Sequence, residues 1–133
     1  MNIEQRRIGD VVVLTVNGDI TMGNNATHVA DAVRRELDLE RTRLLLDLGR
    51  VRYVDSTGLG VLVEGFSAAK NRGGALKLLH VTSRINTLLV ITRLLTVFEC
   101  FDEEAEAVAS FQQGATYAAK TNAAYEQRAN PAA

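Results

Sequence analysis

The chain has 133 residues, 47% of them hydrophobic, and its 15 basic and 16 acidic residues give a net charge of −1. This length suits one domain with a sizeable core, and the balanced charge argues against a broad basic surface for nucleic acid or an anionic membrane. No apolar run is long enough for membrane insertion, and the single cysteine, Cys100, cannot form an internal disulfide, so we expect a cytoplasmic protein.

The chain opens with two extended runs, Ile3 to Ile8 and Val11 to Asn17, separated by the turn residues Gly9-Asp10. Turn residues between two such runs predict a β-hairpin. The second run is almost continuously apolar, which predicts a central strand covered on both faces.

Strands and helices are expected to alternate after the hairpin. Helices are predicted from Asn24 or Asn25 to about Glu40, from about Thr57 to Arg72, from Ser83 to Leu94 and from Asp102 to about Gln112, with strands at Arg43 to Leu48, Ala75 to Val81 and Val97 to Phe101. This order predicts an α/β fold over residues 1–113, with a mixed sheet and four helices packed mainly on one face. Residues 114–133, rich in Ala and Asn, are expected to form a mobile tail or a frayed helix.

A polar turn, Asp55-Ser56-Thr57, stands between an apolar strand and an apolar-faced helix. One of these residues is the expected N-cap, since such side chains accept hydrogen bonds from the free amides of a first helical turn. Those amides also favour an anion, and Gly58 and Gly60 are expected to keep the approach free of Cβ atoms. Another protein should therefore reach the Ser56 hydroxyl, although spacing alone favours a plain capping role.

The loop from Gly18 to Asn25 also follows a strand and precedes a helix. Because the carboxyl ends of parallel strands gather along one rim of a sheet, this loop is predicted to neighbour the turn from Asp55 to Gly60. Sheets of this class usually bind ligands along that rim.

The patterns of catalytic and cofactor-binding sites are missing. A dinucleotide fingerprint would need a glycine in place of Val63, and neither a P-loop nor a Gly-x-Ser-x-Gly elbow is present. The two histidines, His28 and His80, and Cys100 are far apart in sequence, so no metal-ligand spacing can be read. We therefore expect no enzyme activity, no cofactor and no metal site.

The residues carry a resemblance to the STAS domain, the fold of bacterial anti-sigma factor antagonists, over roughly Ile3 to Phe111. Leu44 to Leu48, followed by Val54 to Leu62, is similar to the family's strand, Asp-Ser-Ser/Thr-Gly turn and helix. Supporting segments are Gly18-Asp19-Ile20-Thr21, Gly73-Gly74-Ala75-Leu76 and Leu95-Thr96-Val97-Phe98. Many relatives have an aspartate where this chain has Thr21.

The resemblance implies a regulator that works by exchanging partners. The serine matching Ser56 would be phosphorylated, with Thr57 as a less favoured acceptor. The unphosphorylated form would bind an anti-sigma factor that is also a serine kinase and so release a sigma factor, while a serine phosphatase would reset the cycle. The expected partner-binding residues are Asp19, Thr21, Asp55, Ser56, Thr57, Gly58 and Gly60, on a monomer or weak homodimer.

Two other roles of the same fold remain open. One is a scaffold in a large stress-signalling assembly, and the other is a cytoplasmic subunit of a lipid-transport complex. In both, the serine matching Ser56 need not be phosphorylated. A kinase-fold partner, a very large native mass or co-purification with a membrane transporter would distinguish the three.

Overall fold

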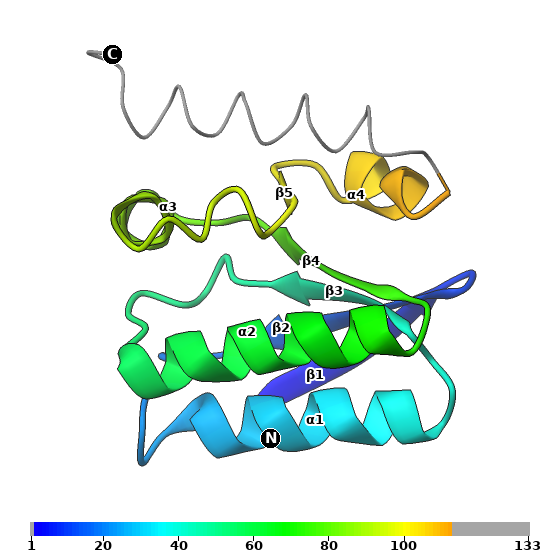
Figure 1. Cartoon of the computed structure of the whole chain (residues 1–133), viewed down its shortest axis with the longest axis horizontal. Coiled ribbons are helices and arrows are strands. Elements are labelled where there is room, and N and C mark those ends of the chain that lie inside the picture. The colour runs from blue at the N-terminus through cyan, green and yellow to red at the C-terminus, as the bar shows by residue number, and fades with distance from the viewer. Residues whose placement is uncertain (1, 113–133) are drawn as a thin grey trace.

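The computed structural model describes residues 2–112, which form a five-stranded sheet and four helices (Figure 1). In chain order the elements are β1 (Ile3–Ile8), β2 (Val11–Val16), α1 (Asn25–Asp38), β3 (Arg43–Asp47), α2 (Ser56–Asn71), β4 (Ala75–Leu79), α3 (Ser83–Ile91), β5 (Cys100–Phe101) and α4 (Glu104–Ser110). The strands lie side by side in sequence order, with β1 antiparallel to β2 and every later pair parallel. The predicted hairpin and mixed sheet are confirmed.

Alternation along the strands builds a core on each face of the sheet. In β2, Val12, Leu14 and Val16 pack in the larger core with α1, α2 and α3, whereas Val11 and Val13 belong to a smaller core that includes Ala107 of α4. Figure 1 shows α1 and α2 side by side along the sheet. Three helices therefore share one face, and α4 is the exception on the other.

A buried lysine helps to hold α4 on that second face. The Lys77 Nζ lies 2.7 Å from Glu99 Oε2 and donates to the hydroxyl and backbone oxygens of Ser110 at 2.9 and 3.0 Å. Its ammonium also lies 4.6 Å from the centre of the Phe111 ring. These contacts join β4 to the end of α4.

Two predicted strands were too long by two residues or more. β4 ends at Leu79 because His80 takes a positive φ of 56°. Only Cys100–Phe101 of the expected last strand pairs with β4. The preceding segment bonds to itself, with the amides of Val97 and Phe98 donating to the carbonyl of Leu94 at 3.0 and 3.1 Å.

The sequence pattern predicted the end of α2 correctly and the cap at the start of α1 incorrectly. Gly73, at φ 80°, and Gly74 close α2 by donating to the carbonyls of Lys70 and Ala69, which confirms the predicted glycine cap. No side-chain cap forms at Asn24. The Asn25 side chain is buried, and its Nδ2 donates instead to the backbone oxygens of Asn17 and Asp19, at 3.3 and 2.9 Å. The predicted tail at 114–133 lies outside the described residues.

Candidate functional site

The two loops that follow β2 and β3 meet on the carboxyl rim of the sheet. Ile20 and Val54 form a parallel bridge. The amide of Ile20 donates to the carbonyl of Tyr53 at 3.0 Å, and the amide of Asp55 donates to the carbonyl of Ile20 at 3.3 Å. The predicted neighbourhood of these loops is confirmed, and backbone bonds fix their relative position.

Gly58 is buried in this junction, which corrects the expectation that it leaves the approach to Ser56 open. A Cβ at this position would lie 2.0 Å from the carbonyl oxygen of Ile20. Gly60 differs, because a Cβ there would meet nothing within 4 Å. Gly58 is therefore buried and permits the close contact between the two loops, whereas Gly60 is exposed at the surface.

Asp55 is the N-cap of α2 and ties the two loops together with its side chain. Its Oδ1 accepts from the amide of Gly58 at 2.8 Å, and its Oδ2 accepts from the amide of Met22 at 3.0 Å. These bonds to Gly58 and Met22 favour the charged carboxylate and lower the pKa of Asp55 below its ordinary value of 3.8. The rim thus carries a fixed negative charge beside Ser56.

Ser56 is the first residue of α2, and both it and Thr57 are exposed. Neither hydroxyl has a hydrogen-bond partner among residues 2–112. Of the three residues that could cap α2, Asp55 supplies the cap, and the Thr57 side chain is exposed to solvent. Both hydroxyls are accessible to a partner.

Asp19 and Thr21 flank the turn from the loop after β2. The Asp19 Oδ1 accepts from the amides of Arg52 and Tyr53, at 3.2 and 3.1 Å. The backbone oxygen of Thr21 accepts from the amides of Asn24 and Ala26, at 3.0 and 3.3 Å. Both residues are half-buried and hold the shape of their loop.

The sequence motifs did not identify two exposed side chains beside the turn, Met22 and Tyr53. Met22 and Tyr53 have 76% and 51% of their surface exposed, and their backbones bond to Asp55 and Ile20, respectively. Met and Tyr are enriched in protein interfaces relative to the rest of the protein surface. Neither belongs to a helical or alternating pattern, so periodicity gave no signal for them.

Within residues 2–112, neither the histidines nor the cysteine forms a hydrogen bond with the Ser56 turn. The Nδ1 of His80 is 3.1 Å from Asp47 Oδ1, and His28 lies on the exposed side of α1. Cys100 is buried, which raises the pKa of its thiol to about 12. Residues 2–112 contain no group of three His, Cys, Asp or Glu side chains placed to hold a metal ion. In the same range, no helix has the length and apolarity needed to cross a bilayer.

The sequence model of the STAS domain matches residues 2–107, which include the whole sheet and both rim loops. The chain belongs to the STAS domain family. The fold and the family predicted from the sequence are therefore confirmed.

Relatives of this STAS domain include named regulators. An anti-sigma-B factor antagonist of Listeria monocytogenes is 32% identical over 113 residues, covering 80% of this chain and 95% of that protein. An anti-sigma F factor antagonist of Paenibacillus polymyxa is 23% identical over 117 residues, covering 84% of this chain and 96% of the other. A crystal structure from Thermotoga maritima has a TM-score of 0.78 at 25% identity and covers 84% of this chain and 95% of its own.

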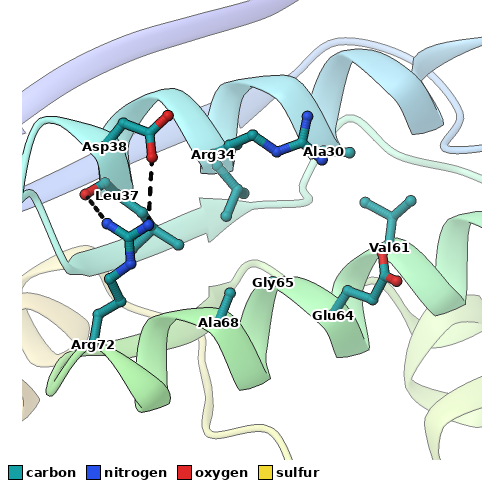
Figure 2. A pocket seen from close by; sticks show the side chains of 10 residues that line it. Ala30, Arg34, Leu37, Asp38, Val61, Glu64, Gly65, Ala68 and Arg72 are labelled. Carbon is teal, nitrogen blue, oxygen red and sulfur yellow. Dashed lines mark hydrogen bonds and ion pairs between the residues drawn. The ribbon is translucent and has the colours of Figure 1, made fainter.

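A groove of about 290 Å³ runs between α1 and α2 of this STAS domain (Figure 2), and its lining does not include Asp55, Ser56 or Thr57. Small residues such as Gly65 and Ala68 line the α2 side. Arg72 closes one end by donating to the backbone oxygen of Leu37 at 2.8 Å and to Asp38 Oδ1 at 3.4 Å. The groove has charges of both signs and no group that links it to the rim site.

Proposed function

We propose that this protein is a cytoplasmic anti-sigma factor antagonist that binds an anti-sigma factor through the rim around Ser56. The names of the Listeria and Paenibacillus relatives support this role, since each match spans at least 95% of the relative. The rim supplies a rigid, bonded junction of two loops, with Met22 and Tyr53 exposed beside it. Rigid surfaces lose little conformational entropy on binding.

Phosphorylation of Ser56 is proposed to switch this binding off. The observation that carries the proposal is the exposed, unbonded hydroxyl at the first position of α2, adjacent to the fixed carboxylate of Asp55. In the kinase step, the Ser56 Oγ attacks the γ-phosphorus of ATP bound to the partner, ADP leaves, and the hydroxyl proton passes to a base of the kinase. A serine phosphatase reverses the change by hydrolysis, which releases inorganic phosphate.

The expected effect is loss of docking without loss of the fold. A phosphate adds about −1.5 to −2 charges at neutral pH, and the free amides at the start of α2 stabilise an anion there. Beside Asp55, however, the added charge repels an approaching acidic group and places hydrated oxygens within the interface. A thousandfold loss of affinity needs only about 4 kcal/mol.

The test starts with tagged parent protein expressed in its native cells and captured with its partners. We expect a kinase-fold anti-sigma factor to be recovered with the parent and with Ser56→Ala, and the purified pair to transfer phosphate from ATP to the parent alone. A very large native mass without a kinase would support the scaffold role instead, and recovery of a membrane transporter would support the transport-subunit role.

A matched control separates the effect of position from that of charge. Ser67 is also exposed on α2, about 16 Å along the helix axis from Ser56. Ser56→Asp is expected to weaken partner binding, whereas Ser67→Asp adds the same charge and should bind like the parent. Because aspartate mimics phosphate imperfectly, binding by enzymatically phosphorylated protein is measured in parallel. Equal binding by the phosphorylated and unphosphorylated forms would exclude the switch.

A further inference from the structure

A hollow of about 430 Å³ lies on the rim, between the segment that leads into the Ser56 turn and the start of α3. Asp19, Arg52, Tyr53, Thr82 and Arg84 line it. Tyr53 precedes Ser56 by three residues, a stretch of chain that spans at most about 11 Å. The hollow is therefore within reach of any partner that covers Ser56.

Two arginines that line the hollow do not help to hold the described part of the fold together. Within residues 2–112, the guanidinium groups of Arg52 and Arg84 have neither an ion pair nor a hydrogen bond, and both side chains are exposed. Arg50, by contrast, donates to Asn17 Oδ1 at 2.7 Å and to Glu4 Oε2 at 3.4 Å. Two cations thus face one hollow without a partner of their own.

Two other polar groups of the hollow, Asp19 Oδ1 and the Thr82 hydroxyl, already have hydrogen-bond partners. Asp19 is its only acidic residue, and the Oδ1 of Asp19 accepts two backbone amides. The hydroxyl of Thr82 accepts from the amide of Ile85 at 3.4 Å. The hollow therefore has a net positive charge and free donors, which fit a negatively charged group.

We propose that this hollow receives an aspartate or glutamate side chain of the anti-sigma factor, an inference that rests on the proposed function. A guanidinium presents its N–H groups in a planar fork that matches a carboxylate. The half-exposed ring of Tyr53 supplies an apolar wall beside the two arginines. Docking excludes water from the hollow, and the attraction between the charges is stronger there than at an open surface.

This arrangement also connects the hollow to the switch at Ser56. Because Tyr53 lies at most about 11 Å from Ser56, little more than the Debye length of about 8 Å at physiological salt, a charge on Ser56 acts on the near side of the hollow. A phosphate on Ser56 would offset the positive charge of Arg52 and Arg84 and repel the incoming carboxylate. The unphosphorylated rim leaves the arginines free to attract it.

The test measures equilibrium affinity for the purified kinase-fold partner recovered with the parent chain. Arg52→Glu and Arg84→Glu are expected to weaken binding about tenfold or more, because each loses a charge-assisted hydrogen bond. The matched control is Arg7→Glu, which makes the same charge change on an exposed residue of β1. Since β1 is antiparallel to β2 and Arg7 pairs with Val12, this residue lies toward the opposite end of the sheet.

Thermal melting of each variant confirms that it is folded, and Arg52→Gln and Arg84→Gln repeat the test without introducing a negative charge. Replacing the matching acidic residue of the partner with lysine should restore binding to Arg84→Glu. Equal losses in Arg7→Glu and the two hollow variants would indicate general charge attraction and overturn the proposal. Control-like binding by both hollow variants, with Ser56→Asp still defective, would overturn it and leave the switch intact. If the parent itself recruits no kinase, the proposed function fails first.

Discussion

Replacement of Gly58 by alanine tests the loop junction on which the rim site depends. The added Cβ would lie 2.0 Å from the Ile20 oxygen, where ordinary contact begins at 3.4 Å, so the two groups must separate by about 1.4 Å. The same oxygen accepts the amide of Asp55 at 3.3 Å, a bond that this shift would break. The steric strain should cost about 1–3 kcal/mol and the lost bond about 1 kcal/mol.

Better helix propensity returns about 1 kcal/mol, so we expect Gly58→Ala to lower the free energy of unfolding by about 1–3 kcal/mol. Gly60→Ala is the matched control, because it adds a methyl group to the same helix with nothing within 4 Å. It should stabilise the protein by up to about 1 kcal/mol. Urea unfolding followed by circular dichroism measures both. Equal stability of the two variants would refute the close contact between Gly58 and Ile20.

Three further predictions concern single groups. An NMR titration should give Asp55 a pKa below 3.8. The Asp55 carboxylate then contributes its full stabilisation above pH 3.8, and this is lost as the pH falls through the folded-state pKa. A pKa above 3.8 would contradict the hydrogen bonds from the amides of Gly58 and Met22. Asn25→Ala leaves the carbonyls of Asn17 and Asp19 without their donor and should cost about 1–3 kcal/mol in denaturant unfolding; an unchanged midpoint would argue against this role. Cys100, whose buried thiol has its pKa raised to about 12, should react with a thiol reagent only as fast as the protein opens, and rapid labelling of the native state would contradict its burial.

Local chemistry made much of the fold predictable. Gly9-Asp10 between two extended runs marked the hairpin, and Gly73-Gly74 marked the end of α2, because each pair suits a conformation that few other residues adopt. The apolar run of β2 marked a strand covered on both faces, and its residues do pack into both cores. These features depend on neighbours in sequence.

The errors arose where contacts with a loop, outside the helix or strand pattern, decide the structure. Asn25 is of a residue type that often caps helices, but its side-chain Nδ2 donates to the backbone carbonyls of Asn17 and Asp19 in the preceding loop. Gly58 predicted an open approach to Ser56. In the structure, the backbone oxygen of Ile20 lies so close that only a residue without a Cβ fits at this position. Contacts between loops leave no periodic trace in the sequence.

The same limit applies to the rim surface. The motif located Ser56 and Asp55, since the residues around them are adjacent in the chain. Arg84 comes from a different element, and only the packing of α3 against the sheet brings it to the hollow shared with Arg52. Met22 likewise becomes a neighbour of the turn only through the bond from its backbone amide to Asp55 of the other loop.

The most direct test of the proposed switch is phosphopeptide mapping, with intact mass, of the protein purified from its native cells across growth conditions. We predict a phosphate on Ser56 of the parent that is absent from Ser56→Ala. A parent protein that never carries phosphate on Ser56, while its partners still co-purify, would contradict it.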